Sequence, residues 1–410
     1  MALRHRNLQP IAAEALSSFP AVMLLGGRQV GKSTLAQLLS DPGTRYTTLD
    51  DSATLALATH DPVAYLTTPG DTTLVIDELQ RRPELMLDIK ASIDRNREPG
   101  RFILTGSADL LRLQRTPDSL AGRAALLQVE GFSQGELNNR VEDFVAVLEH
   151  CPDSVTHSDL ARHDYAELLA RGGFPEIQTL SPRGRRLWYD SYLTQLVQRD
   201  AGDLGVTYQS ERLSQLLRVL AANQSGELVK AHMASRADLP ATSVTPYLDL
   251  LSRLFLTYTL PPWTNNTLQR VTGKPKSGIR DIGLAAHLLG TSSQRLSEPG
   301  NPHLGALLES FVATELLKQR SWSEVQFDIH HFRDSRGNEV DIIIELADSG
   351  IWGVEVKASQ TVRFDHFSTL VKLRDQLGHR FRGGVVLSLH PEPLPMGPRL
   401  WAMPVSALWS

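Results

Sequence analysis

The sequence predicts a multi-domain α/β protein in which a mostly parallel sheet forms the first domain. Short apolar runs alternate with helical segments early in the chain, and a glycine-rich loop joins the first run to a helix. Alternation of helices and strands returns from about residue 300, after a middle section that reads as mainly helical. At 410 residues the chain is too long for one ordinary domain, so roughly two to four are expected.

The composition is that of a soluble globular protein, with 41% hydrophobic and 21% charged residues. A formal net charge of -4 provides no overall attraction to nucleic acid, so such a contact would need a local basic patch. Cys151 is the single cysteine, which excludes an intrachain disulfide and fits a reducing cytosol. Because no apolar run is long enough to cross a bilayer and the N-terminus lacks a signal-peptide core, we expect a cytoplasmic protein without a membrane partner.

The elements of the first domain follow in order along the chain. Strands are predicted at 21–25, around Thr48, around Ile76 and at 101–107. Residues 33–40 and 83–96 have helical spacing between these strands. Helices that separate the strands in this way favour a parallel sheet with helices on both faces.

The loop at 26–33 reads GGRQVGKS and matches the pattern G-x-x-x-x-G-K-[ST] between a strand and a helix. Glycines allow the backbone N–H groups to face phosphate oxygens, and the start of the helix adds positive potential. Lys32 would reach the β- and γ-phosphates, and the Ser33 hydroxyl would bind Mg²⁺. The predicted nucleotide-binding residues are Gly26, Gly27, Arg28, Gln29, Val30, Gly31, Lys32, Ser33, Thr34 and Ser107.

An acidic pair ends the apolar run LVIDE at 74–78. Asp77 would hold the shell of the Mg²⁺ ion, and Glu78 would orient and activate the attacking water. Two acids can also simply close a strand, but the glycine-rich loop would then lack its metal-holding acid. The sequence therefore predicts ATP and Mg²⁺ as cofactors, with Lys32 and Glu78 as catalytic residues and Ser33 and Asp77 at the metal.

Two further features follow the fourth predicted strand. Thr105 and Ser107 close that strand, where either hydroxyl could sense the γ-phosphate, although hydroxyl residues commonly end strands. Arg123 ends the segment DSLAGR, where an arginine could neutralise transition-state charge in its own site or in a neighbour's. A surface arginine in a helix-end turn is the alternative for this predicted catalytic residue.

The middle of the chain contains a compact helical unit at 211–262 that resembles a winged helix, followed by a loop rich in Pro, Asn and Gly at 261–278. Its helix in the recognition position carries Arg253 against Asp249, so the charge cancels and an interdomain or oligomer contact is favoured over DNA binding. An upstream basic group is a better phosphate candidate, although a solvated helix start explains it more simply. Its members are Arg183, Arg185 and Arg186.

The last segment carries a second set of polar residues. Strand alternation in NEVDIIIE predicts Asp341, Ile343 and Glu345 on one face, and in GVEVKAS it predicts Glu355 and Lys357 on one face. Asp341, Glu355 and Lys357 can thus converge at one end of a sheet. Two carboxylates on Mg²⁺ with a nearby lysine are what cleavage of a phosphodiester requires, so these three are predicted catalytic residues.

A helix at 304–319 precedes these strands and adds a third acid. Glu309 lies beside an apolar stripe, where a carboxylate is costly unless something binds it. Glu315 is placed similarly and is the weaker candidate. Glu309, Asp341 and Glu355 form a predicted second site for Mg²⁺ or Mn²⁺ that matches the D…ExK pattern of nuclease-like folds. The stripe consists of Leu304, Leu307, Leu308, Phe311 and Val312.

Nearly the whole chain resembles one family of proteins. GGRQVGKST, LVIDELQRRPELMLDIK, RFILTGSADLL and SLAGRAALL, followed by RGGFPE, the helix ending in QRD and GIRDIGLAAHLLG, resemble the prokaryotic AAA-type ATPases with a C-terminal domain of unknown function. The resemblance implies an ATPase core, a winged-helix-like middle and a C-terminal domain similar to restriction-endonuclease folds. It does not supply a substrate.

These observations lead to a four-part division: an AAA-type P-loop core at 1–140, a helical lid or linker at 141–210, the winged-helix-like unit at 211–262 and a restriction-endonuclease-like domain at 263–410. The expected function is Mg-dependent ATP hydrolysis that drives a conformational switch coupled to a nuclease-like domain. The alternative is an ATP-dependent regulatory or scaffold protein whose nuclease-like domain is silent and binds a protein partner. Nucleic acid and further copies of the chain are the other candidate partners. A carboxylate cluster with bound Mn²⁺ would favour cleavage, whereas Lys357 locked on Glu355 or Asp341 would favour the silent domain.

Overall fold

The computed structural model describes residues 4–67, 72–106, 120–197, 210–264 and 273–410. The chain divides into two compact units, which are described separately. The first comprises Met1–Phe132 with Arg253–Phe255, and the second comprises Ser133–Ser252 with Leu256–Ser410. No helix in the described residues is long and apolar enough to span a membrane.

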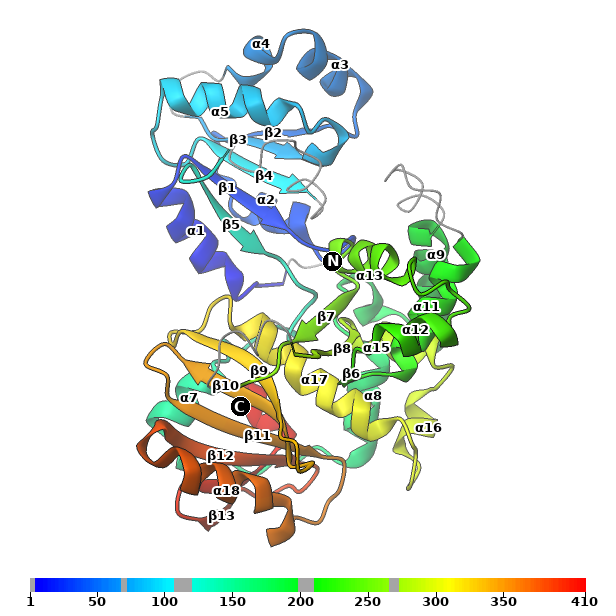
Figure 1. Ribbon diagram of the computed structural model, residues 1–410. Coiled ribbons are helices and arrows are strands. Elements are labelled where there is room, and N and C mark those ends of the chain that lie inside the picture. The colour runs from blue at the N-terminus through cyan, green and yellow to red at the C-terminus, as the bar shows by residue number, and fades with distance from the viewer. Residues whose placement is uncertain (1–3, 68–71, 107–119, 198–209, 265–272) are drawn as a thin grey trace. The chain divides into compact units, whose positions relative to one another are not determined.

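The first unit contains the predicted parallel sheet, which has five strands in the order β2-β3-β4-β1-β5 (Figure 1). Alternate residues of β1 face opposite sides of the sheet, and all of them are buried. The strands are β1 (Ala21–Leu25), β2 (Arg45–Thr48), β3 (Leu74–Asp77), β4 (Phe102–Gly106) and β5 (Ala124–Gln128). The helices are α1 (Leu8–Ser18), α2 (Lys32–Leu38), α3 (Ser52–His60), α4 (Pro62–Leu66) and α5 (Leu85–Arg95), with a 3-10 turn η1 (Leu79–Arg81).

The second unit begins with helices and a small antiparallel sheet in the order β6-β8-β7. The expected loop at 261–278 therefore ends in a strand, because β8 pairs with both β6 and β7. The winged-helix assignment of this part remains a prediction. The helices are α6 (Gln134–Leu137), α7 (Phe144–His150), α8 (Arg162–Arg171), α9 (Pro182–Gln195), α11 (Ser210–Ala222), α12 (Lys230–Arg236), α13 (Val244–Arg253), α15 (Ile282–Leu288) and α16 (Ser293–Ser297); the strands are β6 (Gly226–Glu227), β7 (Thr257–Leu260) and β8 (Lys276–Ile279).

The C-terminal part of the second unit is a six-stranded mixed sheet in the order β13-β14-β12-β11-β10-β9. Helix α17 (Leu304–Gln319) contacts β11 and β9, and α18 (Ser368–Leu377) packs on a core that includes Val340, Ile343 and Val386. All five residues of the predicted apolar stripe of α17 are buried. The strands are β9 (Phe327–Arg333), β10 (Glu339–Leu346), β11 (Ile351–Lys357), β12 (Phe381–Ser388), β13 (Leu394–Gly397) and β14 (Leu400–Pro404).

The segment that follows the first unit packs against this C-terminal sheet. The indole nitrogen of Trp401 donates to Asp153 at 2.8 Å, and the Ser406 hydroxyl donates to Ser158 at 2.7 Å. This segment lies within the stretch 141–210, for which a lid or linker is predicted from the sequence. These partners lie 248 residues apart, so the pairing follows from tertiary packing and has no local signal in the sequence.

Candidate functional site

The glycine-rich loop connects β1 to α2 and depends on two glycine positions. Gly31, at the start of α2, has a φ of 97°, in a region that side chains disfavour. A Cβ atom at Gly26 would overlap the carbonyl oxygen of Val129. The predicted strand–loop–helix context is present, and the loop requires glycine for both conformation and space.

Lys32 lies inside this loop and is 7% exposed. Its ammonium group donates to the carbonyls of Gly27, at 2.6 Å, and Gly26, at 3.1 Å. Burial lowers the pKa of Lys32, while the carboxylates of Glu78 and Asp77 oppose that shift. The loop thus holds a desolvated ammonium group at its centre, which favours exchange of the carbonyl partners for anionic oxygens.

Asp77, at the end of β3, is the point where three hydroxyl groups converge. Ser33 donates to its Oδ1 at 3.0 Å, and Tyr46 of β2 donates to its Oδ2 at 3.0 Å. Thr105 of β4 also donates to Oδ1. The two residues predicted to hold Mg²⁺, Ser33 and Asp77, are therefore in direct contact, and Asp77 is supported from both strands that neighbour β3.

Glu78 follows Asp77 in a left-handed backbone conformation, with a φ of 59°. Such a conformation is costly for a residue other than glycine and often occurs at functional sites. The amide of Glu78 donates to the Thr105 hydroxyl at 3.1 Å, and Gln80 donates to the Glu78 carboxylate. Thr105 is fully buried and contacts both acids, so it supports the site from within the sheet, and its role as a sensor of the γ-phosphate stays a prediction. Ser107, the other predicted sensor, lies outside the described residues.

Arg123 precedes β5 and lies at the end of the strands opposite to the end that carries the glycine-rich loop. Its carbonyl accepts from the amide of Ala21 at the start of β1, whereas the loop follows the end of β1. At about 3.3 Å per residue, five residues of a parallel strand span roughly 16 Å. The guanidinium donates to Asp94 at 2.8 and 3.1 Å. In this conformation the guanidinium is paired with Asp94, away from the loop of its own chain, and the catalytic role of Arg123 stays a prediction.

The sequence analysis missed two residues that support the loop. Arg6 donates to the carbonyl of Val30 at 3.0 Å and to that of Glu130 at 2.6 Å. Tyr46, described above, is the second. No motif marks either residue, because both act through contacts to residues distant in sequence.

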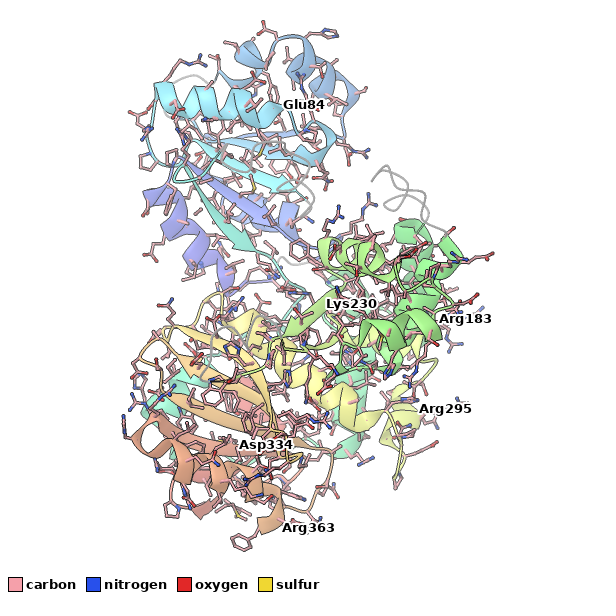
Figure 2. The ribbon with its side chains drawn as sticks, viewed as in Figure 1. Glu84, Arg183, Lys230, Arg295, Asp334 and Arg363 are labelled. Atoms are coloured by element: carbon pink, nitrogen blue, oxygen red, sulfur yellow. The ribbon has the colours of Figure 1, made fainter. Side chains whose placement is uncertain are left out.

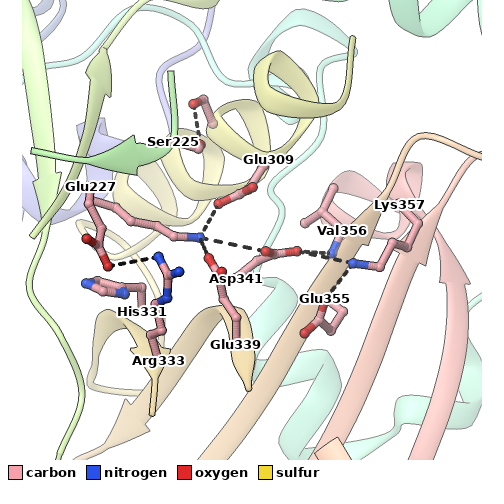
Figure 3. A network of polar contacts seen from close by, with 12 residues as sticks. Ser225, Glu227, Glu309, His331, Arg333, Glu339, Asp341, Glu355, Val356 and Lys357 are labelled. Atoms are coloured by element: carbon pink, nitrogen blue, oxygen red, sulfur yellow. Dashed lines mark hydrogen bonds and ion pairs between the residues drawn. The ribbon is translucent and has the colours of Figure 1, made fainter. Parts of the chain in front are cut away.

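The predicted C-terminal constellation does come together where the start of β10 meets the end of β11 (Figure 3). The Asp341 carboxylate accepts from the amide of Val356 at 2.8 Å. The ammonium group of Lys357 lies 2.7 Å from Glu355 and 3.9 Å from Asp341. The chain thus places a carboxylate from each of two adjacent strands beside one lysine.

The predicted alternation along β10 does not hold through Asp341. The pairing with β9 shifts register between Val340 and Ile343, and both of these residues belong to the core beneath α18. Glu345 accepts from the indole of Trp263 at 3.3 Å. Asp341, Ile343 and Glu345 therefore do not form one polar face, because the irregularity interrupts the period of two.

Lys276 of β8 is a member of this site that the sequence analysis missed. Its ammonium group lies 2.8 Å from Glu309, 2.6 Å from Glu339 and 3.7 Å from Asp341, and its side chain is 5% exposed. Figure 3 shows these three carboxylates turned toward one nitrogen atom. Lys276 lies in the stretch expected to be a loop, so nothing in its local pattern indicated a buried position.

The electrostatics of the site follow from four carboxylates and two lysines, of which Glu339 and Lys357 are partly exposed and the others are largely buried. Burial raises the pKa of Glu309 to about 8, and the Asp341 carboxylate adds to the shift. Burial and Asp341 likewise raise the pKa of Glu355 to about 8. Burial lowers the pKa of Lys276, but Glu309 and Asp341 outweigh that effect and leave it above its ordinary value. Among the described residues, no group of three or more His, Cys, Asp or Glu side chains is arranged to hold a metal ion.

The remaining candidates lie elsewhere. Glu315 is fully buried and accepts from the amide of Gln134 at 2.8 Å, so it anchors the start of the second unit away from this site. Arg185 is buried and pairs with Glu167 at 2.7 Å. Arg183 is exposed on α9 (Figure 2). The predicted basic group is therefore split, and Arg185 is committed to an ion pair.

The sheet order and the glycine-rich loop with its two acids define the first unit as a P-loop ATPase domain of the AAA type. Residues 18–138 match the family described as AAA domain. Residues 162–295 and 304–408 match two families described as domains of unknown function, DUF8612 and DUF4143. The resemblance to AAA-type ATPases is confirmed, and the nuclease-like character of the C-terminal domain stays a prediction.

Two uncharacterized proteins, of Mycobacterium tuberculosis and Mycobacterium bovis, are each 30% identical to this chain over 364 residues. The match covers 88% of this chain and 75% of each relative, and the chain belongs to the same family as these proteins. Among solved structures, a Walker-type ATPase of Pyrococcus abyssi is 15% identical to this chain. The match covers 70% of this chain and 95% of that protein's chain, with a TM-score of 0.44. The RuvB Holliday junction branch migration motor of Thermotoga maritima is 18% identical to this chain. That match covers 62% of this chain and 87% of the motor's chain, with a TM-score of 0.29.

Proposed function

We propose that this protein binds and hydrolyses Mg·ATP and uses the cycle as a conformational switch. The observation that carries the proposal is the 3.0 Å contact between the Ser33 hydroxyl and the Asp77 carboxylate beside the loop that holds Lys32. A hydroxyl and a carboxylate are oxygen donors of the kind that Mg²⁺ prefers. The loop and its acid are therefore matched to a metal–nucleotide pair.

Each residue of this site has a distinct role in the proposal. Lys32 binds phosphate oxygens in exchange for the carbonyls of Gly26 and Gly27. Ser33 and Asp77 hold the metal, which when bound neutralises charge on the phosphates. Glu78 orients the attacking water and accepts its proton, with Thr105 keeping the turn in place.

The switch acts on a C-terminal domain that serves as a binding platform in the state described. The ion pairs of two lysines support this choice over cleavage. Lys357 is paired with Glu355 at 2.7 Å, and Lys276 lies among Glu309, Glu339 and Asp341. The pairing of Lys357 with Glu355 is the arrangement expected of a silent domain. A protein partner or a nucleic acid would bind this platform according to the nucleotide state.

Metal-dependent cleavage of nucleic acid is the second candidate function. It is favoured by one observation, the meeting of Asp341, Glu355 and Lys357 at adjacent strand ends. In that case Mg²⁺ or Mn²⁺ bound by Asp341, Glu355 and Glu309 would supply the charge neutralisation that phosphodiester cleavage needs.

One set of assays tests both functions. We expect Mg²⁺-dependent ATP hydrolysis by the full chain that Lys32→Ala abolishes; absence of hydrolysis by the wild type would overturn the ATPase proposal. Cleavage of single- or double-stranded DNA or RNA, measured with Mn²⁺ and with or without ATP, is expected to be absent. If the wild type does cleave nucleic acid, and Asp341→Asn or Lys357→Ala abolishes the cleavage but not ATP hydrolysis, the C-terminal domain is a nuclease and the binding-platform proposal is wrong.

A further inference from the structure

Lys276 does not come from the domain whose carboxylates it contacts. It lies on β8, within the stretch that matches the DUF8612 family, whereas Glu309, Glu339 and Asp341 lie within the DUF4143 match. The middle of the chain thus inserts a buried cation into the acidic centre of the C-terminal domain.

The backbone around Lys276 is held in place on both sides. Lys276 pairs with Glu227 in the small antiparallel sheet, and the side chain of Glu227 forms an ion pair of 3.1 Å with Arg333 of β9. The carbonyl of Lys274 lies 3.0 Å from the imidazole Nε2 of His331, also on β9. These contacts tie β8 to the C-terminal sheet and hold the lysine at a defined position.

The ammonium group of Lys276 is within hydrogen-bonding distance of Glu309 and Glu339, and it forms a longer ion pair of 3.7 Å with Asp341. Carboxylates brought this close repel one another unless a cation lies between them. Oxygen ligands of this kind otherwise bind a hard divalent cation. The cluster therefore already contains a cation, supplied by the chain itself.

We propose that Lys276 is an internal cation that takes the place of a divalent metal among Glu309, Glu339 and Asp341. Metal and lysine exclude each other, so the C-terminal carboxylates bind Mn²⁺ only when the ammonium group is removed. This inference deepens the proposed function, since it rests on the C-terminal domain being a metal-free platform in the state described. The middle of the chain thereby controls whether the platform can become a metal site.

The test measures Mn²⁺ uptake by calorimetry and electron paramagnetic resonance, without nucleotide, on the full chain. Every sample carries Ser33→Ala and Asp77→Asn, which remove the proposed metal ligands of the nucleotide site. We expect no uptake with Lys276 intact and one Mn²⁺ per chain in Lys276→Met, lost again when Asp341→Asn is added. Lys274→Met is the matched control, because Lys274 is an exposed lysine two residues away, and it should bind no Mn²⁺.

Two results would overturn the proposal. One is Mn²⁺ uptake by the chain with Lys276 intact, if Asp341→Asn abolishes that uptake. The other is the absence of Mn²⁺ uptake in a folded Lys276→Met variant. Lys276→Gln, which keeps a hydrogen-bonding side chain, replaces Lys276→Met if the latter does not fold, with the same expected gain. If neither variant folds, the sample with Lys276 intact decides: no uptake supports the internal cation, and Asp341-dependent uptake overturns it. ATP hydrolysis by the wild type is measured separately, so failure of the ATPase proposal is distinguishable from failure of this one.

Discussion

The carboxylate of Asp281 accepts a hydrogen bond of 2.7 Å from the amide of Gly173, although the two residues lie 108 positions apart. Asp281 also accepts from the amide of Leu284 at 2.8 Å and from the Tyr189 hydroxyl at 3.0 Å. One partly buried carboxylate therefore joins the segments RGGFPE and GIRDIG to helix α9. The two segments, which are distant in the sequence, therefore stabilise each other through this carboxylate.

Replacement of Asp281 by asparagine is expected to destabilise the second unit by about 1–3 kcal/mol, the usual cost of a buried group left unpaired. The amide NH₂ group of asparagine would face an N–H donor at one of the two carboxylate positions. Chemical denaturation measures the change. The control is Asp190→Asn, which alters an exposed acid on α9 that pairs with His287, and a loss as large as that of Asp281→Asn would contradict the assignment.

ATP with Mg²⁺ should raise the melting temperature of the wild type. A ligand at about a hundred times its Kd stabilises by about 2.7 kcal/mol. Lys32→Ala should erase the shift, because the loop loses its phosphate-binding cation. Glu78→Gln should keep the shift and stop hydrolysis, and an unchanged hydrolysis rate in that variant would refute the role of Glu78.

Thr105→Val tests the support that β4 gives to the two acids. Valine has nearly the same shape but cannot donate to Asp77 or accept from the amide of Glu78. We expect kcat to fall by roughly 10–100-fold, the usual effect of losing a partner that orients a metal ligand. KM for ATP should change little, because the phosphate-binding loop is intact. A rise in KM alone would show that Thr105 contacts nucleotide, as the sequence suggested.

Arg123 is expected to act on the nucleotide of a neighbouring copy, because it lies at the end of the strands away from its own glycine-rich loop. ATP hydrolysis per chain should then fall on dilution. Arg123→Ala mixed with Lys32→Ala should regain activity, since an intact loop can pair with an intact arginine. Arg97→Ala is the control, because Arg97 is exposed and also pairs with Asp94. A rate independent of concentration, without rescue on mixing, would exclude this role.

Stability should depend on pH through Glu309 and Glu355, whose pKa is about 8 in the fold against an ordinary value of 4.5. A carboxyl group with a raised pKa holds its proton more tightly in the folded state. Its contribution is complete below about pH 4.5 and is lost as the pH rises through about 8. Calorimetric melting temperatures should therefore fall over this range. Glu309→Gln should flatten the dependence relative to Glu324→Gln, an exposed control, and an equal slope in both would contradict the assignment.

The sequence by itself determined the nucleotide site and most of the elements around it. Glycines at fixed spacing with Lys32 and Ser33, and an acid that ends an apolar run, are local patterns whose chemistry allows few other uses. The parallel sheet and the buried stripe of α17 follow from periodicity, which is also local.

Only the tertiary structure decided which distant groups meet. It placed Arg123 at the end of the strands away from its own loop, turned Thr105 toward Asp77 and Glu78, and interrupted the alternation of β10 at Asp341. It also inserted Lys276, from a stretch without periodicity, among three carboxylates of another domain. The physical reason is that a buried ion pair depends on which side chains share a desolvated volume, and sequence spacing does not encode that volume.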